Sequence, residues 1–189
     1  MTENVPEAMP PKKVHMVFAG NIDQIAVQRL ANAIAIASQQ GMDEVHLLFQ
    51  TTGGVVADGV CLYNLFAAAP MDIHLYNVGS IASIGVVAYL GADFRYTTNN
   101  ATFMIHKVTF SPQAATVDRL QSLANAAALD DRRIEDILHQ HIELPKEKWD
   151  IHKVSDLWLS AEEALAVKLA DRIGEFSPSS GEQLYYVGQ

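Results

Sequence analysis

The sequence predicts an α/β protein whose sheet is largely parallel. In the first hundred residues, short apolar runs typical of strands alternate with segments whose apolar residues recur at helical spacing. Turn residues such as Gly20-Asn21 and Gly41 separate the two kinds of segment. The chain has 189 residues, of which 49% are hydrophobic, and this is enough for one domain with a filled core. Strands that alternate with helices favour parallel pairing through crossover helices.

The elements of this first part follow one another at short intervals. Asp23 is placed to cap the first helix and Gly41 to end it, and Pro70 closes the second helix. A third helix begins at Ser83. The strands are expected over residues 14–19, 45–49, 73–78, 94–97 and 102–105, and the helices over 24–40, 55–69 and 83–90.

The chain changes character after His106. A helical pattern runs over 114–141, which is longer than a typical helix. Such a helix either lies on the surface or extends toward another subunit. Ser160 and Glu163 form a capping box before a helix that ends near residue 170, and a short strand follows over 171–173. We therefore expect an N-terminal arm (1–13), a single domain (14–176) that includes a distinct segment at about 107–143 built around this long helix, and a C-terminal tail (177–189).

Composition excludes several classes of function. The net charge of −9 argues against binding to nucleic acid, because a polyanion would be repelled. Cys61 is the only cysteine, so neither a disulfide framework nor a cysteine zinc site is expected. No residue pattern indicates a metal or a cofactor. No apolar run reaches the roughly 18 residues of a membrane span, and no signal sequence is evident. We expect a cytoplasmic protein without a membrane partner.

Ser83 lies where a buried strand gives way to a helix of small residues, Val78 to Leu90. A serine there could simply cap the helix, which is common. It could also be a nucleophile, because free backbone N–H groups at a helix start can bind a developing oxyanion. The paired glycines Gly53-Gly54 follow another strand, and the carboxyl ends of parallel strands are the usual place for chemistry. This coincidence favours the nucleophile.

One histidine differs from the others in its position. His15, His46 and His74 lie within strands, where a structural role is expected. His106 follows the strand that ends at Ile105, so it could reach Ser83 as a general base. Spacing alone makes this a weak signal, because catalytic serines and histidines are recognised by geometry.

Four blocks of sequence, in order, are similar to the ClpP family, the proteolytic subunits of Clp protease. They span 48–55 (LFQTTGGV), 78–85 (VGSIASIG), 103–106 (FMIH) and 159–164 (LSAEEA) followed by 170–173 (ADRI). The likeness covers roughly residues 14–175. It implies a ClpP/crotonase-like fold, a superhelix of repeated ββα units with a long handle helix, which here would be the helix over 114–141.

The resemblance also implies an activity and roles for particular residues. ClpP proteins are serine peptidases that cleave peptides by acyl-enzyme chemistry inside a chamber of their own subunits. By position, Ser83 is the nucleophile and His106 the general base. The backbone N–H groups of Gly53 and Ile84 form the oxyanion hole. No cofactor is implied.

The residue that should orient His106 departs from the family pattern. The family has an aspartate ahead of the Ser-Ala-Glu-Glu block, and counting back from Ser160 without a gap places His152 there. An imidazole cannot supply the fixed negative charge that stabilises an imidazolium. Asp150 or Asp156 could take the role if the loop is shifted, and the sequence leaves the three candidates open.

Partners follow from the same resemblance. It implies self-association into rings, stacked through the handle helices, and an AAA+ unfoldase that feeds substrate. The short proline-bearing arm before Val14 argues against the unfoldase, because the family has a gated axial loop there. Thr51-Thr52 stands where relatives usually have Ser-Pro. Two alternatives remain: a catalytically impaired ClpP-like subunit with a structural or regulatory role, and a crotonase-type acyl-CoA enzyme, which would need a pocket for the CoA phosphates.

Overall fold

The computed structural model describes residues 10–111 and 114–188, so most of the expected N-terminal arm lies outside the described part. The strands are β1 (Lys13–Ala19), β2 (Glu44–Gln50), β3 (Asp72–Asn77), β4 (Ser80–Ala82), β5 (Phe94–Thr97), β6 (Thr102–Ile105), β7 (Leu157–Ser160), β8 (Arg172–Ile173) and β9 (Leu184–Tyr186). The helices are α1 (Gln24–Gln39), α2 (Val56–Ala67), α3 (Ile84–Tyr89), α4 (Val117–His141), α5 (Lys146–His152) and α6 (Ala161–Ala166).

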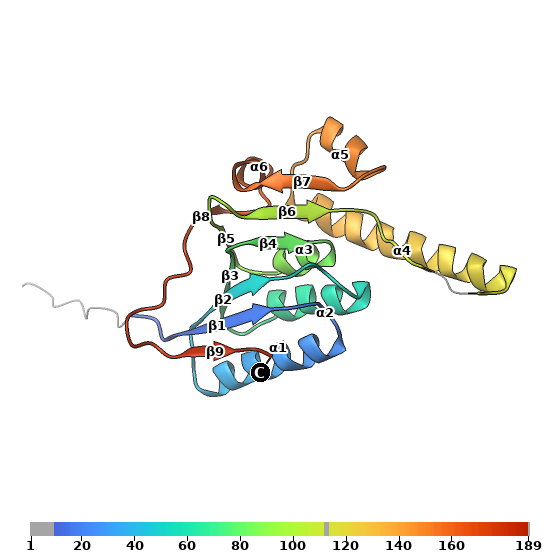
Figure 1. Cartoon of the computed structure of the whole chain (residues 1–189). Helices are drawn as coiled ribbons and strands as arrows, with labels where there is room; N and C mark the ends of the chain where they lie inside the picture. Colours follow the sequence, from blue (N-terminus) through green and yellow to red (C-terminus); the bar gives the residue numbers. More distant parts are fainter. Residues whose placement is uncertain (1–9, 112–113, 189) are drawn as a thin grey trace, which may run out of the picture.

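These elements form two sheets (Figure 1). The larger has six strands in the order β8-β5-β3-β2-β1-β9, and every pair in it is parallel. The smaller has the order β4-β6-β7, with β4 and β6 parallel and β7 antiparallel to β6. The largely parallel sheet that the sequence predicts is therefore confirmed.

Local sequence signals place several element ends as predicted. The Asp23 carboxylate accepts a hydrogen bond from the Ala26 N–H at 2.8 Å and so caps α1. Gly41 follows that helix with φ of +66°, a conformation that glycine adopts without cost. Ser160 and Glu163 form the predicted capping box at the start of α6.

Three strands and the helix α5 were not expected, and α6 ends earlier than predicted. The short strand β4 interrupts the passage from β3 to α3, and β7 and β9 are similarly short. The α6 helix ends at Ala166 rather than near Ala170, because Lys168 has a positive φ of 62° that turns the chain out of the helix. Within the tail, β9 pairs in parallel with β1 and extends the sheet.

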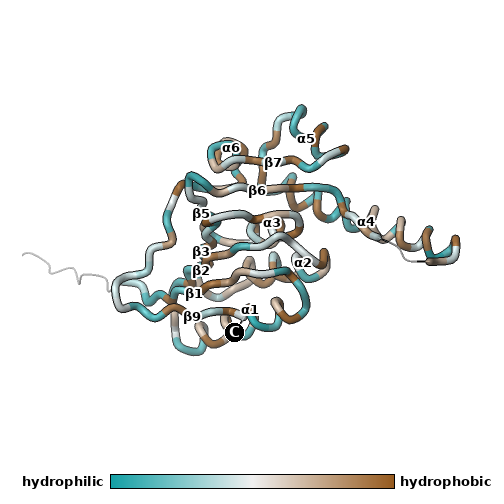
Figure 2. Tube along the Cα trace, in the orientation of Figure 1, coloured by the Kyte–Doolittle hydropathy of each residue, from teal (hydrophilic) through white to brown (hydrophobic). Residues whose placement is uncertain are grey.

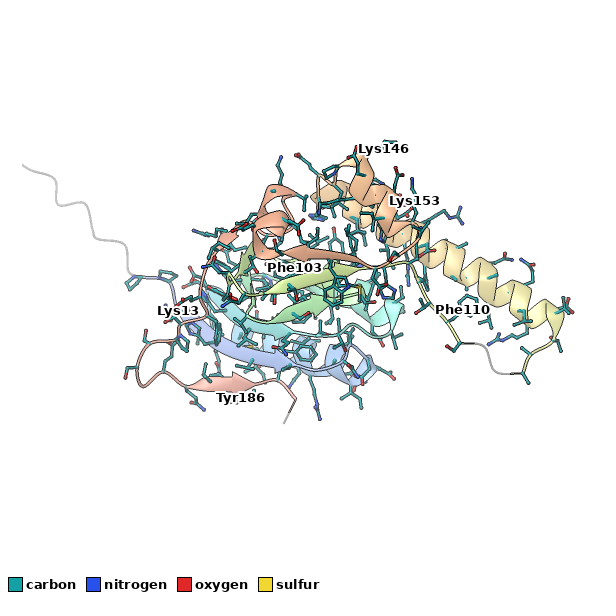
Figure 3. The ribbon with its side chains drawn as sticks, turned by 45° about the horizontal axis from the view of Figure 1, so that its top comes forward. Lys13, Phe103, Phe110, Lys146, Lys153 and Tyr186 are labelled. Carbon is teal, nitrogen blue, oxygen red and sulfur yellow. The ribbon has the colours of Figure 1, made fainter. Side chains whose placement is uncertain are left out.

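One face of the larger sheet forms the core. Along β2, Val45, Leu47 and Phe49 are buried and alternate with residues that are only partly buried. The buried rings of Phe66 from α2 and Phe103 from β6 extend this core, and Figure 3 shows Phe103 in the interior. Among the described residues, no helix has both the length and the apolar character that a membrane crossing requires.

The α4 helix reaches beyond the body of the molecule (Figure 1). Only Ile134 and Leu138, near its carboxyl end, are buried. The side chains of Val117, Leu120 and Leu129, which precede these two residues on the helix, are apolar and exposed. Figure 2 shows apolar and polar residues mixed along α4. The protruding handle that the resemblance implies is therefore present in the structure.

Candidate active site

Ser83 and His106 meet at the ends of two paired strands. The Ser83 Oγ lies 2.8 Å from the His106 Nε2, which is hydrogen-bonding distance. Ser83 directly follows β4 and His106 directly follows β6, and these strands pair in parallel with Ala82 opposite Met104. The Ser83 N–H donates to the Met104 carbonyl at 2.7 Å and holds the two ends together. The structure thus brings together the two residues that the sequence singled out.

The backbone of Ser83 is strained. Its φ of 57° and ψ of −133° lie in a region that L-residues rarely adopt, at a cost of roughly 1–3 kcal/mol. Ser83 occupies the N-cap position of α3, yet its hydroxyl makes no capping hydrogen bond. The hydroxyl faces His106 instead, so helix capping does not explain this serine. Strain of this kind is characteristic of positions where a fold presents a reactive group.

The Gly53-Gly54 turn lies directly against Ser83. Gly53 has φ of +98°, and a Cβ built on it would lie 2.6 Å from the Ser83 Cβ and 3.1 Å from its Oγ. Only glycine allows this approach. The Gly53 N–H donates to the Thr51 Oγ1 at 3.0 Å. Ile84 is the first residue of α3, so its N–H has no intrahelical acceptor and is available to a ligand.

Gly54 is a donor candidate that the sequence reasoning did not name. The Ile22 N–H donates to the Gly53 carbonyl and the Val55 N–H donates to the Ile22 carbonyl, each at 2.9 Å. Ile22 is the bridge partner of Gly54, but the backbone of Ile22 bonds to Gly53 and Val55, the neighbours of Gly54, and not to Gly54 itself. The Gly54 N–H takes no part in this pairing, and Gly54 lines the same pocket as Ser83. The sequence signal that could have identified this donor is the second glycine of the Gly53-Gly54 pair.

A small pocket adjoins the serine and the histidine. Its volume is ≈ 60 Å³, and Val56, Val87, Ile134 and Leu138 give it an apolar wall. The Ile134 and Leu138 side chains come from α4, so the handle helix closes one side of the site. A narrow apolar recess beside a nucleophile suits a short apolar side chain of a substrate.

Ion pairs tie the segment after His106 to α4. The Lys107 Nζ lies 2.5 Å from the Glu135 Oε1 and 3.8 Å from the Asp131 Oδ2. The Val108 N–H donates to the Asp131 Oδ1 at 2.8 Å. These contacts fix the chain immediately beyond His106 and thereby restrict the position of the imidazole.

Neither candidate aspartate reaches His106. Asp150 is exposed on α5 and binds Lys146 at 2.6 Å and Lys153 at 3.1 Å. These hydrogen bonds, that of Lys146 above all, hold the pKa of Asp150 below its usual value. Figure 3 shows both lysines on the outside of the molecule. Asp156 is exposed in the turn before β7. Among residues 10–111 and 114–188, the only side-chain hydrogen bond of His106 is the one to Ser83.

His152 occupies a buried place close to the neighbours of His106. Its side chain is 1% exposed, and in the described part of the chain neither ring nitrogen has a hydrogen-bond partner. The His152 Nε2 lies 4.0 Å from the Glu135 Oε1, the same oxygen that binds Lys107. Burial lowers the pKa of His152, and the charge of Lys107 lowers it further. A neutral imidazole therefore stands at the position where counting from Ser160 places the family aspartate.

The lowered pKa of His152 predicts a dependence of stability on pH. The unfolded chain, in which histidine has a pKa of about 6.5, binds more protons than the folded chain below that value. The free energy of unfolding should therefore fall as the pH drops below about 6.5 and towards the folded pKa, by at most roughly 1.4 kcal/mol per pH unit for this group. His152→Gln should flatten this slope in urea unfolding at a series of pH values. An unchanged slope would contradict the account, and His139→Gln serves as the exposed control.

Comparisons with known proteins identify the family of this chain. The model of the Clp protease family matches residues 8–177. The ATP-dependent Clp protease proteolytic subunit of Streptococcus equi subsp. equi is 31% identical over 158 residues, which cover 81% of this chain and 80% of the relative. That of Deinococcus radiodurans is 27% identical over 165 residues, covering 85% and 80%.

A solved structure shows the same fold. A mutant of ClpP1 from Listeria monocytogenes superposes with a TM-score of 0.75 at 20% sequence identity, covering 85% of this chain and 91% of the other. Together with the two-sheet architecture, the protruding α4 and the family match over most of the sequence, this shows that the chain belongs to the Clp protease family and has the ClpP/crotonase-like fold.

Proposed function

We propose that this protein is a serine peptidase subunit that cleaves peptides or unfolded polypeptides through an acyl-enzyme. The observation that carries the proposal is the 2.8 Å contact between the Ser83 Oγ and the His106 Nε2 at a strained backbone position. Membership of a family of proteolytic subunits supports the same reaction class.

In the proposed mechanism, the His106 Nε2 accepts the hydroxyl proton as the Ser83 Oγ attacks the peptide carbonyl carbon. The carbonyl oxygen becomes an oxyanion, which the Ile84 N–H and an N–H of the Gly53-Gly54 turn stabilise. His106 then gives the proton to the leaving amine. A water molecule then loses a proton to His106 and attacks the ester carbonyl. His106 returns that proton to the departing Ser83 Oγ, which releases the acid product and restores the free serine.

Either glycine of the Gly53-Gly54 turn can supply the N–H that binds the oxyanion. The Gly53 N–H contributes if it exchanges the Thr51 hydroxyl for the oxyanion, which requires a 3.0 Å hydrogen bond to break. The Gly54 N–H contributes without that exchange, because it is not engaged in the bridge with Ile22. The Thr51 hydroxyl therefore competes with the oxyanion for the Gly53 N–H.

We further propose that the subunits assemble into stacked rings through α4. Val117, Leu120 and Leu129 are exposed apolar side chains of this helix, and its amino-terminal part extends beyond the body (Figure 1). Apolar side chains on a protruding element are typical of contacts between subunits. An AAA+ unfoldase as a partner has its support in the relatives' designation as ATP-dependent.

Hydrolysis of a fluorogenic peptide with small apolar residues tests the proposal. The full chain, in its assembled form by gel filtration, should release the fluorophore with saturation kinetics. Absence of any hydrolysis above the rate of the peptide in buffer, with the protein folded and assembled, would contradict it.

Two observations favour a second candidate, a ClpP-like subunit with impaired catalysis. The described residues place no carboxylate in hydrogen-bonding contact with His106, and the Gly53 N–H is already engaged by Thr51. The first would slow acylation, and the second would slow it where Gly53 is the donor used; neither changes the fold. The crotonase-type alternative gains no such support, because Lys107 is the sole basic side chain, besides His106 itself, among the described residues lining the pocket and it is paired with Glu135.

Gly53→Ala should reduce peptide hydrolysis about 100-fold, since displacing a reacting group by about 1 Å costs that much. The new methyl group would lie 2.6 Å from the Ser83 Cβ, and the φ of +98° adds strain. Gly41→Ala is the matched control: it has a positive φ of +66° but no atom within 4 Å of the added Cβ. Values of kcat/KM for the two variants should therefore differ widely. Equal losses would contradict the proposed approach of Gly53 to Ser83.

A further inference from the structure

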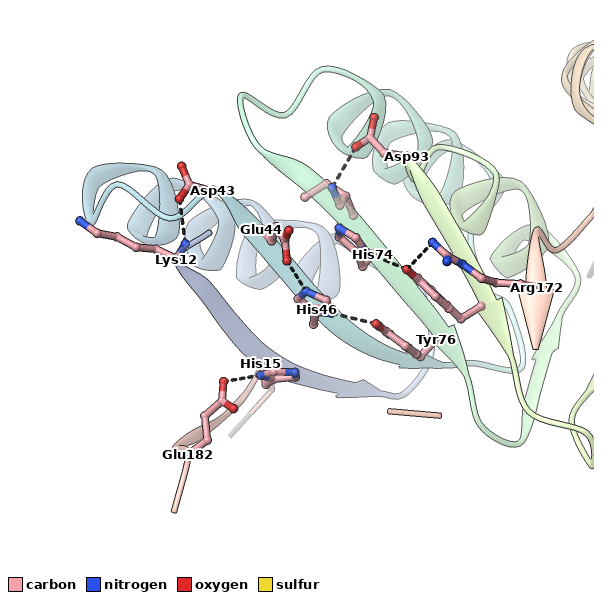
Figure 4. A network of polar contacts seen from close by, with 12 residues as sticks. Lys12, His15, Asp43, Glu44, His46, His74, Tyr76, Asp93, Arg172 and Glu182 are labelled. Atoms are coloured by element: carbon pink, nitrogen blue, oxygen red, sulfur yellow. Dashed lines mark hydrogen bonds and ion pairs between the residues drawn. The ribbon is translucent and has the colours of Figure 1, made fainter. Parts of the chain in front are cut away.

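A second cluster of chemically active side chains lies at the opposite end of β2 from Ser83. His15, His46 and His74 occupy directly paired positions on β1, β2 and β3, so their rings form a row across the sheet (Figure 4). The centroids of His15 and His46 are 4.9 Å apart and those of His46 and His74 are 4.3 Å apart. Glu44 precedes His46 by two residues on β2 and therefore projects from the same face.

Three of these residues direct donor atoms toward one point. One ligand atom each from Glu44, His46 and His74 lies within 4.8 Å of the other two. The Glu44 Oε2 is 2.8 Å from the His46 Nε2. Ligands about 2.1 Å from a tetrahedral zinc ion are separated by roughly 3.4 Å. Small side-chain rotations would therefore bring the three atoms to coordinating positions.

In His46 and His74, the ring nitrogen Nδ1 is hydrogen-bonded to a tyrosine. The His46 Nδ1 lies 2.8 Å from the Tyr76 hydroxyl, and the His74 Nδ1 lies 3.2 Å from the Tyr96 hydroxyl. When Nδ1 carries the proton and donates to the tyrosine oxygen, Nε2 is left free for a metal. An outer hydrogen bond orients metal-binding histidines in the same way, although its usual acceptor is a carboxylate, a carbonyl or water.

The His74 Nε2 provides the strongest evidence for a ligand. This atom is buried, the residue is 7% exposed, and no described residue forms a hydrogen bond with it. A buried polar atom without a partner is costly, and such atoms in a native structure call for an explanation such as a bound ion. A cation between His74 and Glu44 would satisfy it.

We propose that Glu44, His46 and His74 bind a divalent transition-metal ion of the zinc class. Two imidazole nitrogens and one carboxylate oxygen form a donor set that suits such ions rather than Mg²⁺ or Ca²⁺, which require mostly oxygen ligands. The ion joins the amino-terminal ends of β2 and β3, and a water molecule takes the fourth position. Because Ser83 lies beyond the carboxyl end of β2, this site is separate from the peptidase chemistry.

Zinc titration of the tag-free full-length chain, stripped with EDTA and dialysed, tests the proposal. Isothermal calorimetry should show one Zn²⁺ bound per chain. At a free Zn²⁺ concentration about 100 times Kd, the Tm should rise by roughly 5–10 °C. Glu44→Gln, His46→Gln and His74→Gln should each weaken binding by about 100-fold or more, since loss of even an outer-shell partner of a ligand costs about 10–100-fold.

His15→Gln and His106→Ala are the controls. His15 belongs to the same row of rings but pairs with Glu182 instead of pointing at the three ligands, so its loss should leave Zn²⁺ affinity within about threefold of the unsubstituted chain's value. His106→Ala should bind Zn²⁺ with the affinity of the wild-type chain, and this result would exclude binding at the Ser83 site. The proposal is overturned if the wild-type chain binds no Zn²⁺, or if Glu44→Gln leaves the Zn²⁺ affinity unchanged. Glu44 is only partly buried at the start of β2, so this variant should fold even where His74→Gln does not.

Discussion

Replacement of Ser83 by alanine is expected to lower kcat for peptide hydrolysis by a factor on the order of 10⁴ or more, the usual cost of removing a catalytic nucleophile. The reason is geometric. The Ser83 Oγ is the hydroxyl that lies 2.8 Å from the His106 Nε2, so it is the group placed to form the acyl-enzyme. Initial rates over a series of peptide concentrations would give kcat and KM separately, and KM should change little.

Ser80→Ala is the matched control for this prediction. Ser80 lies on β4 three residues before Ser83, and its hydroxyl contacts the Thr102 hydroxyl at 3.4 Å rather than a histidine. Its replacement should leave kcat within about twofold, because surface and strand substitutions without catalytic contacts have small effects. If Ser83→Ala retained the activity and Ser80→Ala lost it, the assignment of the nucleophile would be wrong.

His152→Asp is expected to raise kcat by at least about tenfold, since loss of the orienting carboxylate costs a triad up to about 10⁴. A carboxylate at this buried position would supply the negative charge that stabilises the imidazolium of His106. The structure supports the choice of position, because His152 is buried near Lys107 and Glu135, which flank and anchor the segment containing His106. The gain should appear in kcat rather than in KM, and it should require Ser83.

Asp150→Asn tests the alternative in which Asp150, rather than the residue at position 152, orients His106. Asp150 is exposed and bound by Lys146 and Lys153, so its neutralisation should not alter kcat. If Asp150→Asn abolished hydrolysis and His152→Asp did nothing, the loop would have to rearrange in the assembled protein to bring Asp150 to His106. The impaired-subunit candidate predicts a low starting activity together with the full gain from His152→Asp.

Much of the fold could be predicted because its signals are local. The apolar runs that became β1, β2 and β3 and the periodicity of α1 and α2 are complete within short windows. Asp23, Gly41 and the Ser160–Glu163 box act within one helical turn, and the structure confirms each of them. The strands β4, β7 and β9 are not predicted because other local signals dominate there: small residues before Ser83, the Ser160 cap, and a Gly/Ser-bearing tail. Their pairing depends on partners that are distant in the sequence.

The candidate site, like the fold, combines features that the sequence predicts with features that it does not. Ser83, His106 and the glycine pair could be recognised from residue type and order, and the structure places them together. The hydrogen bond from the Gly53 N–H to Thr51 could not, because it depends on the exact shape of a turn. The row of histidines was predicted as three separate structural residues. Its register across β1, β2 and β3 arises only when the sheet forms.

The central claim, that Ser83 is a nucleophile activated by His106, is tested most directly by labelling with a fluorophosphonate. The assembled wild-type chain is incubated with the probe, digested and mapped by mass spectrometry. The account predicts one adduct, on the peptide that contains Ser83, with no adduct in Ser83→Ala and much slower labelling in His106→Ala. An assembled, folded wild-type chain that stays unlabelled, or that carries its adduct on another serine, would contradict it.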